Sequence, residues 1–371
     1  MGNWRSGELC DFITLKRGFD LPQQKREDGQ VPIFSSSGIT GTHSTAMVNA
    51  PGVITGRYGT IGEVFYAAED FWPLNTTLFV ENFHGNDAKF IYYFLKTLEW
   101  SKFTSASAVP GINRNTVHKE TVSLPDIETQ RRIASTLSML DEKIKTNTEI
   151  NDNLEQQAQS YFQELFVDNA SPEWTTGTIS DLGTVVGGST PSKSKPEYYT
   201  ESGIAWITPK DLSINKSKFV SHGENDITEL GLKNSSAAIM PEGTVLFSSR
   251  APIGYIAIAA GEVTTNQGFK SVVPKPEIGT PFVYFFLKNT LPVIEGMASG
   301  STFKEVSGST MKNVPAVIPD AETLAKFSDF CAPIFEQQRT LEEQNQSLAK
   351  LRDSLLPKLM SGEIDVSAVQ L

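Results

Sequence analysis

Two arginines stand at matching places in the two halves of the chain, and the chemistry they offer is recognition. Arg57 precedes Gly62 and Arg250 precedes Gly254, so each arginine lies beside a glycine-containing turn. A guanidinium presents a planar fork of hydrogen-bond donors that fits a carboxylate, a phosphate or the edge of a guanine. The same fork can instead clamp a loop carbonyl or a carboxylate as a purely structural contact. The sequence leaves both interpretations open.

Residues that make or break bonds are harder to find. His118 and His222 have no carboxylate or nucleophile motif around them, and such isolated histidines are usually structural or exposed. The stretch from Gly183 to Gly188 is not followed by Lys-Thr or Lys-Ser, which excludes a P-loop, and the chain has no Gly-x-Gly-x-x-Gly loop. We therefore expect no catalytic residues and no metal site, and we expect that the protein is not an enzyme.

Composition narrows the class of protein further. A length of 371 residues is typical of two or three domains, and 39% hydrophobic residues suffice for packed cores. No apolar run approaches the roughly 20 residues of a membrane span, and the first residues do not resemble a signal peptide. Only two cysteines are present, Cys10 and Cys331, which fits a reducing compartment. We expect a cytoplasmic protein.

The net charge of −11 is distributed unevenly. Residues 1–125 carry −1, residues 126–170 carry −5, residues 171–319 carry −1 and residues 320–371 carry −4. The two large segments are thus nearly neutral, and they can still present a basic face to an anionic partner.

The alternation of charge follows an internal repeat. Trp4 and Gly7 match Trp174 and Gly177 at an offset of 170, the segment 92–96 matches 284–288 at 192, and the segment 124–126 matches 318–320 at 194. Several matches in the same order indicate duplication. Because the offset grows by 24, the second copy carries insertions, which we place in the polar stretch 191–236.

The first 120 or so residues of each copy predict a mixed α/β globule. Segments 52–55, 62–67 and 77–80 have the composition of strands and are separated by Gly, Asn and Pro. The apolar segment 92–96 and its match at 284–288 predict a helix packed on the sheet. Loops at the rim of such a globule are the usual place for recognition.

Each copy ends in a long predicted helix. Acidic residues follow Pro125, and apolar residues then recur at alternating steps of four and three, which is the 3.5-residue period of a coiled coil. The predicted helices cover 126–166 and 320–356, with Pro333 as a kink or as the true start of the second. The predicted seam includes Ile133, Leu137, Leu140, Ile144, Leu154, Phe330, Ile334, Leu341, Leu348, Leu351 and Leu355.

Helices of this length exceed the width of a globule of 120 residues, which favours pairing with each other over packing each on its own globule. The chain order globule–helix–globule–helix makes the pair antiparallel. Asn147, Asn151, Gln337 and Gln344 interrupt the apolar seam, and they either set its register or face solvent.

The ends of the two helices carry a resemblance. Residues 154–166 and 351–365 resemble the ends of the spacer helices in specificity subunits of type I restriction–modification systems. The Trp-x-x-Gly openings and the Arg57 and Arg250 stretches are similar to the target recognition domains of that family. The resemblance covers nearly the whole chain in the right order.

The resemblance implies a fold and a function. The fold is α+β, with two pseudo-repeated mixed α/β target recognition domains separated by two long helices that form an antiparallel coiled coil. The implied domains are 1–125 and 171–319 for recognition, 126–170 for the first spacer helix, and 320–371 for the second spacer helix and tail. Each recognition domain reads one half of a bipartite double-stranded DNA target, and the helices set the gap between the halves.

The resemblance also implies partners that this chain does not contain. Two methyltransferase subunits, using S-adenosylmethionine to methylate adenine N6, are held by the helices, and a restriction subunit that uses ATP and Mg can join. The chain has no Asn-Pro-Pro-aromatic motif of such a methyltransferase and no cofactor of its own. The alternative function is a non-catalytic coiled-coil adaptor for protein interactions, which the acidic helices and a pI near 5.0 favour.

DNA contacts require Arg, Lys, Asn, Gln, Ser and Thr on loops that reach the grooves or the phosphates. In the first copy the candidates are Lys16, Arg17, Lys25, Arg26, Ser36, Arg57, Tyr58, Asn75, Asn113 and Arg114. In the second copy they are Ser192, Lys193, Lys195, Lys210, Ser249, Arg250, Asn266, Gln267, Ser301 and Lys304. Each lysine can instead be merely solvated, and Asn75 and Asn266 can be turn residues that bond their own backbone.

Overall fold

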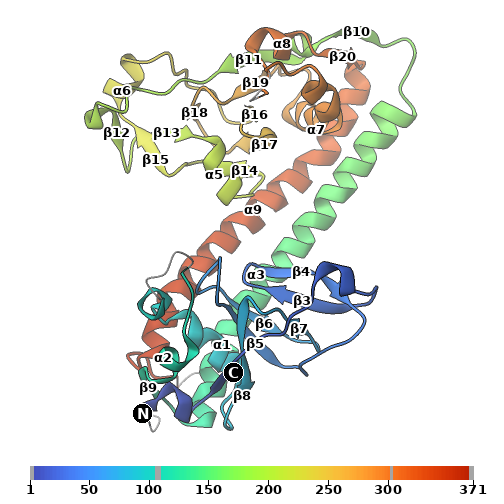
Figure 1. The fold of residues 1–371 in the computed structure, drawn as a ribbon. Coiled ribbons are helices and arrows are strands. Elements are labelled where there is room, and N and C mark those ends of the chain that lie inside the picture. The colour runs from blue at the N-terminus through green and yellow to red at the C-terminus, as the bar shows by residue number, and fades with distance from the viewer. Residues whose placement is uncertain (1–3, 105–109, 301–303, 367–371) are drawn as a thin grey trace. The chain divides into compact units, whose positions relative to one another are not determined.

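The computed structural model describes residues 4–104, 110–300 and 304–366. The chain divides into two compact units (Figure 1). Unit 1 comprises Met1–Lys145 and Gln346–Leu371, and unit 2 comprises Thr146–Asn345. In the described residues no helix is long and apolar enough to cross a membrane.

Unit 1 is built on a four-stranded antiparallel sheet in the order β2-β8-β5-β6. A three-stranded sheet of order β4-β3-β7 and the small β1-β9 sheet complete its β structure. The strands are β1 (Arg5–Glu8), β2 (Thr14–Arg17), β3 (Val31–Ser35), β4 (Gly38–His43), β5 (Gly52–Gly56), β6 (Val64–Ala67), β7 (Trp72–Pro73), β8 (Thr77–Asn82) and β9 (Thr121–Leu124). The helices are α1 (Ala88–Lys96) and α2 (Arg114–His118), with 3-10 turns at Leu9–Asp11, Gln23–Lys25 and Trp100–Phe103.

The central strand β5 is buried on both faces. Because side chains alternate along a strand, Val53 packs into the core that includes α1, whereas Ile54 packs with Phe34, Phe71 and Phe79 on the opposite face. The strands predicted over 52–55 and 77–80 and the helix predicted over 92–96 are confirmed. The strand predicted from residue 62 begins at Val64, because Gly62 has a φ of 85° and belongs to the preceding turn.

Unit 2 repeats this plan with additions. Its main sheet has the order β11-β19-β16-β17-β14, and a second sheet has the order β12-β15-β13-β18. The strands are β10 (Thr175–Thr178), β11 (Gly183–Gly187), β12 (Tyr199–Thr200), β13 (Ile204–Ile207), β14 (Phe219–Val220), β15 (Asn225–Ile227), β16 (Val245–Ser249), β17 (Ile253–Ala259), β18 (Thr264–Thr265), β19 (Lys270–Pro274) and β20 (Pro315–Ile318). The helices are α4 (Ile179–Leu182), α5 (Pro209–Ile214), α6 (Glu229–Lys233), α7 (Thr280–Gly296) and α8 (Gly308–Lys312), with a 3-10 turn at Pro196–Tyr198.

Matching elements confirm the internal duplication. Helix α1 contains the segment 92–96 and α7 contains its match, and the two-stranded pairs β1-β9 and β10-β20 open and close the two copies. Asp11 and Asp181 occupy the same position in capping boxes that start the first helical turn of each copy. The elements from β12 to α6 lie within the stretch 191–236 where the insertion is predicted.

Both long predicted helices are present and start at an acidic cap. Helix α3 covers Ile127–Gln163 and continues as a π-helical turn over Glu164–Asp168, and α9 covers Ala321–Met360. The Asp126 and Asp320 carboxylates accept the backbone N–H groups of Thr129 and Thr323 at 2.9 and 2.8 Å. Pro333 neither starts nor ends α9.

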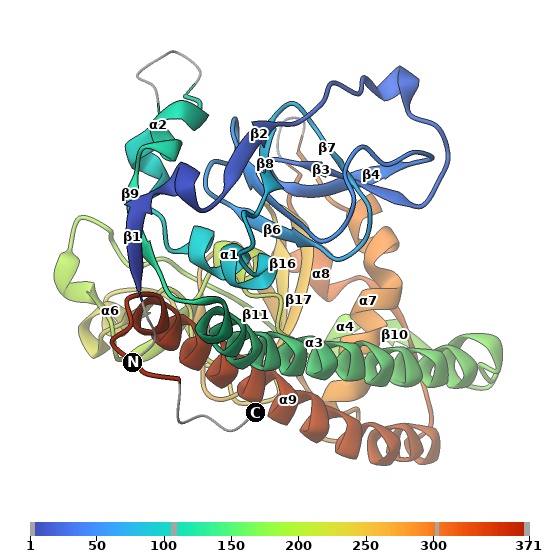
Figure 2. The same cartoon turned by 90° about the horizontal axis from the view of Figure 1, so that it is seen from below.

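In each unit the two helices pack together, as Figures 1 and 2 show. In unit 1 the first part of α3 contributes Ile133 and Leu137 to a core that also contains Leu359 and Met360 from the end of α9. In unit 2 the end of α3 contributes Phe162, whose ring lies 5.8 Å from that of Phe327 near the start of α9. The pairing is antiparallel in both cases, because the start of one helix meets the end of the other.

Half of the predicted seam on α9 is displaced by one residue. Ile334 and Leu341 are buried as expected, but Phe330 and Leu351 are 38% and 47% exposed. The inward positions belong instead to the residues that follow the expected ones. These residues are Cys331, Gln338, Asn345 and Arg352. Three of the four are polar, so a search for apolar periodicity selects their neighbours.

The polar residues of the seam pair with one another across the helices in unit 2. Asn147 is fully buried and donates from Nδ2 to the Oδ1 of Asn345 at 2.9 Å. Gln338 donates to the backbone carbonyl of Asn151 at 3.1 Å. Asn147 and Asn151 thus lie in the interface. Gln337 is exposed, and Gln344 is exposed but accepts from Asn147 Nδ2 at 3.4 Å. The side-chain oxygens of Asn147 and Asn151 are buried without a hydrogen-bond partner among the described residues, but the cross-helix bonds of these amides form in only one alignment, which is how polar seam residues fix register.

A buried ion network joins the sheet of unit 2 to its helices. The Lys218 ammonium, 6% exposed, bonds Glu155 Oε2 of α3 at 2.8 Å and Gln338 Oε1 of α9 at 2.9 Å. Lys288 of α7 bonds the other Glu155 oxygen at 2.5 Å. Burial raises the pKa of the Glu155 carboxyl, but the two ammonium groups outweigh burial and lower that pKa to about 2. Glu155 is therefore the shared anion of this interface.

Replacing Glu155 by Gln should lower the free energy of unfolding by about 3 kcal/mol near pH 7, because the buried Lys218 and the half-buried Lys288 lose their carboxylate. The folded-state pKa is depressed, so the wild-type advantage is complete above about pH 4.5 and is lost as the pH falls toward about 2. Urea unfolding of both proteins near pH 7 and pH 3 measures this difference. Glu336→Gln, at an exposed position of α9, is the matched control. If Glu155→Gln lowered stability equally at both pH values, Glu155 would not be the ionised partner of the two ammonium groups.

Candidate nucleic-acid interface

In unit 1 the strand register brings several predicted contact residues to one edge of the main sheet. Arg17 ends β2 opposite Leu78 of β8, and Gly56 ends β5 opposite Thr77 of the same strand. Because β8 is antiparallel to both neighbours, its start lies beside both of their ends. Arg17, Arg57 and Asn75 therefore come from three segments that meet at this edge.

The Arg57 side chain is held in place by its surroundings. Its guanidinium carbon lies 4.5 Å from the centre of the Tyr58 ring, and Nε donates to the Ile112 carbonyl at 3.4 Å. The backbone N–H groups of Arg57 and Tyr58 both donate to the carbonyl of Thr76. The side chain is half-buried, and its other guanidinium nitrogens make no hydrogen bond or ion pair with the residues that the structure describes. Arg57 thus has both the structural contact and the remaining donors that its two interpretations require.

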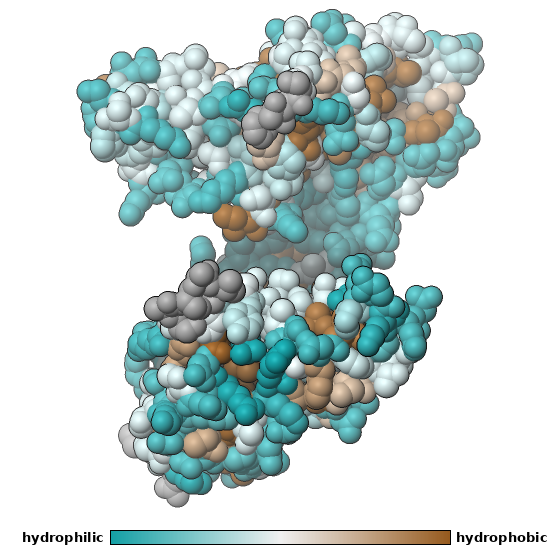
Figure 3. Space-filling view, viewed as in Figure 1, coloured by the Kyte–Doolittle hydropathy of each residue, from teal (hydrophilic) through white to brown (hydrophobic). Residues whose placement is uncertain are grey.

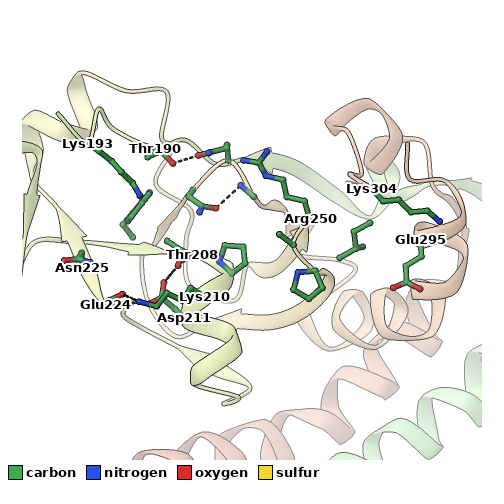
Figure 4. Close-up of a pocket in the computed structure, with 18 residues that line it drawn as sticks. Thr190, Lys193, Thr208, Lys210, Asp211, Glu224, Asn225, Arg250, Glu295 and Lys304 are labelled. Atoms are coloured by element: carbon green, nitrogen blue, oxygen red, sulfur yellow. Dashed lines mark hydrogen bonds and ion pairs between the residues drawn. The ribbon is translucent and has the colours of Figure 1, made fainter. Parts of the chain in front are cut away.

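Unit 2 has the same edge. Gly187 ends β11 opposite Lys270 at the start of β19, and β16 ends at Ser249 on the other side of β19. Arg250 and Asn266 therefore lie at the same edge as Arg57 and Asn75 do in unit 1. By the strand register they are one residue away from the strict counterparts, which are Ser249 and Gln267, because the Ser249 N–H donates to Gly268 as the Arg57 N–H donates to Thr76. Here the edge opens into a cavity of about 1150 Å³. Figure 4 shows Lys193, Lys210 and Glu224 on one side of this cavity and Arg250, Lys304 and Glu295 on the other.

The charges around the cavity are partly paired. Arg250 Nη1 lies 3.6 Å from Glu305 Oε2, and Lys270 Nζ lies 3.7 Å from Glu305 Oε1. Burial lowers the pKa of Lys270, and Glu305 opposes that shift. Lys193 and Lys304 have no carboxylate within ion-pair distance among the residues that the structure describes. The cavity therefore holds a fixed Arg250 and two cations available to an anionic ligand.

A close backbone approach shapes the edge in both copies. A Cβ on Gly18 would lie 2.1 Å from the carbonyl oxygen of Leu74, and a Cβ on Gly188 would lie 2.0 Å from that of Asn266. Only glycine leaves room for these approaches, which hold the loop carrying Asn75 or Asn266 against the end of the first strand. The glycine pair of the repeat is thus part of the edge itself.

Most other predicted contacts of unit 1 lie on its surface. Lys16 bonds Glu81 at 2.5 Å, Arg26 donates to the Thr40 carbonyl at 3.2 Å, and Asn75 donates to Asp20. Asn113 caps α2 by accepting the backbone N–H of Asn115. The exposed or half-buried positions are Arg17, Lys25, Ser36, Tyr58 and Arg114. Lys16, Arg17 and Asn75 would have to exchange an acidic partner for DNA.

In unit 2, Ser249 requires a correction. It is fully buried and its hydroxyl donates to the Gly268 carbonyl at 3.1 Å, so its side chain is not available to a groove edge. Ser301 lies outside the described residues. Asn266 accepts the backbone N–H of Gly268, as the turn interpretation requires, and Gln267 bonds Thr190. Exposed positions are Ser192, Lys193, Lys195, Lys210 and Lys304, of which Lys195 and Lys210 pair with Glu197 and Glu224.

Sequence reasoning missed Glu305, Lys270 and Thr190, which complete the edge around Arg250. Lys270 starts a strand and Thr190 follows one, so neither has a local pattern that separates it from ordinary strand-end residues. The two histidines of interest are structural or exposed, as predicted. His118 accepts the backbone N–H of Leu15 at 2.9 Å, and His222 is an exposed neighbour of Asp226.

No group of three or more His, Cys, Asp or Glu side chains with metal-ligand geometry occurs in the described ranges. The arrangement of the edge is instead that of a recognition surface, with donors, amides and unpaired cations. Such a surface can bind phosphates and read hydrogen-bonding groups, and it occurs once in each unit.

Comparison with known proteins agrees with a protein that has a recognition surface in each of its two units. The description "Type I restriction modification DNA specificity domain" belongs to a family model that matches residues 1–156 and 172–350, so it matches the chain twice. The chain belongs to this family. Its matched ranges correspond to the two copies of the internal repeat.

Two curated relatives are similar along different lengths. The MjaIX specificity subunit of Methanocaldococcus jannaschii is 38% identical over 192 residues, which is 51% of this chain and 44% of that protein. The HindI specificity subunit of Haemophilus influenzae is 25% identical over 347 residues, covering 72% of this chain and 75% of its own. The chain thus spans less than half of the first relative and three quarters of the second.

A solved structure supports the fold. The crystal structure of a type I restriction–modification S subunit from M. genitalium superposes with a TM-score of 0.66, covering 96% of both chains at 18% identity. The predicted fold class, with two mixed α/β domains of one family and long helices, is confirmed.

Gly188→Ala should destabilise unit 2 by about 1–3 kcal/mol, because the new methyl group would overlap the Asn266 carbonyl unless the backbone moves. Gly187→Ala is the matched control in the same segment, since its nearest atom would be a flexible Lys270 carbon at 3.9 Å. Urea unfolding of the two variants compares them. Equal stability of both would show that the approach of the two segments is not a constraint.

Proposed function

We propose that the chain reads a bipartite double-stranded DNA sequence, with one half-site bound by each unit. The observation that supports this most directly is the recurrence of one sheet edge, with Arg57 and Asn75 in unit 1 and Arg250 and Asn266 in unit 2. Arginine is the commonest side chain for guanine, and asparagine suits adenine, so each edge offers base contacts beside cations for phosphates. Segments 1–125 and 171–319 are the two recognition domains in this proposal.

The long helices have the second role in this proposal. Segments 126–170 and 320–371 set the number of base pairs between the half-sites and hold two methyltransferase subunits. These partners would methylate adenine N6 with S-adenosylmethionine, and a restriction subunit could join them. Two relatives are named as specificity subunits of type I restriction enzymes, which supports this role.

The chain itself is non-catalytic in this proposal and acts in the cytoplasm. Cys10 and Cys331 are free, and burial raises the pKa of the Cys331 thiol to about 12, which keeps it unreactive. Two linked half-site contacts also raise affinity, because the first binding event positions the second.

Selection of bound duplexes from a random pool by the complex with methyltransferase subunits should return two short motifs at constant separation. Arg57→Ala should relax preference in one motif and Arg250→Ala in the other, each by about 1–3 kcal/mol, because each arginine serves one half-site. Arg131→Ala, at an exposed position of α3, is the control. Recovery of one contiguous motif or of none, or relaxation of both motifs by either variant, would contradict the assignment of one half-site to each unit.

Four residues inserted into both helices, after Lys145 in α3 and after Asn345 in α9, should lengthen the gap without changing either half-site. Four residues add about 6 Å of helix, comparable to two base-pair steps of about 3.4 Å. The same selection measures the separation. A folded variant that binds the original spacing would contradict the role of the helices as spacers.

A further inference from the structure

The two copies of the repeat differ at one edge of their main sheets. In unit 2 the strand β17 is covered by β14, which pairs with it in parallel at Ile258 and Ala259. In unit 1 the main sheet ends at β6, and β5 is the only described strand that pairs with β6. The edge that is covered in one copy is therefore open in the other.

The register shows that β6 and β17 are counterparts. Val53 pairs with Tyr66 in unit 1, and Val245 pairs with Ile258 in unit 2. Both pairs are related by the offset of 192 that also relates Tyr92 to Tyr284. Tyr66 and Ala68 thus occupy the positions of Ile258 and Ala260.

The strand β14 makes three kinds of contact in unit 2. Its segment accepts the backbone N–H groups of Ile258 and Ala260 at Lys218 and Val220, at 2.7 and 3.0 Å. Its Lys218 ammonium lies 4.5 Å from the centre of the Tyr284 ring. The same ammonium donates to the Glu155 carboxylate. The added segment thus supplies both backbone acceptors and a charged side chain to the sheet edge.

The corresponding place in unit 1 is a groove of about 540 Å³. It is lined by Phe65 and Tyr66 of β6 together with Phe34, Ile39, Lys89 and Tyr92. Ile39 is 65% exposed, so its apolar side chain is available to a ligand in the groove. Figure 3 shows apolar side chains reaching the surface in the lower part of the view, where Figure 1 labels β3 and β6.

The groove of unit 1 has a positive charge of its own. In unit 2 the added segment supplies the cation, Lys218, so a segment that binds in unit 1 is expected to supply an anion instead. Lys89 Nζ lies 3.9 Å from the centre of the Tyr66 ring, so unit 1 supplies its own cation over the aromatic rings. Lys89 has no carboxylate within ion-pair distance in the described part of the chain. The nearby Asp141 is already engaged by Tyr93 at 2.5 Å and by Arg352 at 2.7 Å. Burial lowers the pKa of Lys89, and Asp141, Glu142 and Asp87 only partly offset that effect.

We propose that the open edge of β6 binds an extended segment of a partner protein, which adds to the sheet as β14 does in unit 2 and places an acidic side chain on Lys89. An exposed edge with free backbone donors is the usual template for strand addition, and pockets beside it select alternate side chains. The carboxylate satisfies Lys89, and an aromatic or branched side chain next to it covers Ile39 and Phe65. This binding site is separate from the sheet edge that carries Arg57 and does not depend on DNA recognition.

Two fluorescent octapeptides test the proposal on the full chain. One copies residues 215–222, and the other is the same peptide with Lys216→Glu and Lys218→Glu. We expect the acidic peptide to bind at least about tenfold more tightly than the basic one in fluorescence anisotropy. Hydrogen exchange at Tyr66 and Ala68 should slow when the acidic peptide is bound.

Variants of the chain locate the site. Lys89→Glu should reverse the preference between the peptides, whereas Lys119→Glu, an exposed lysine outside the groove, should leave it unchanged. Ala68→Pro should weaken both peptides, because it removes a backbone donor that β5 does not use. Equal binding of the two peptides, absence of binding up to about 1 mM, or protection that appears away from β6 would each overturn the proposal.

Discussion

The structure depends on the meeting of two helices that are far apart in the sequence. Neither compact unit is closed by a continuous stretch of its own copy, because unit 1 takes Leu359 and Met360 from the end of α9 and unit 2 takes Phe162 from the end of α3. Each helix therefore supplies apolar surface to both cores. The apolar area that each core buries is gained only when the antiparallel pairing is correct, so pairing and core formation are one event.

The register of that pairing is specified by polar groups more than by apolar ones. Apolar contacts tolerate a shift along a helix, whereas the Asn147–Asn345 hydrogen bond forms in only one alignment. The Glu155 carboxylate adds a second condition, since it must meet at once the ammonium groups of Lys218, just before β14, and of Lys288 in α7. A buried network of this kind contributes specificity even where its net contribution to stability is small.

Much of the fold can be predicted from the sequence, because duplication and periodicity are long-range patterns that survive local noise. The repeat, the two long helices and the strands around Ile54 follow from such patterns. The seam of α9 is different, because Gln338 and Arg352 are inward while Leu351 is 47% exposed, and hydrophobicity points to the wrong residue. For the recognition edge, Arg57 and Arg250 stand out through their recurrence. The contact of Glu305 with Arg250 and the burial of the Ser249 hydroxyl against a carbonyl both follow from strand register. The local spacing of residues in the sequence does not reveal that register.

The interleaved boundaries of the units also order events during synthesis. Unit 2 is a continuous stretch, Thr146–Asn345, and all of its packing partners have emerged once that stretch has left the ribosome. Unit 1 begins earlier but needs Leu359, Met360 and Val366 to fill its core. The copy that is synthesised first therefore completes its fold last. Its core lacks part of its apolar surface until the final turns of α9 have been synthesised.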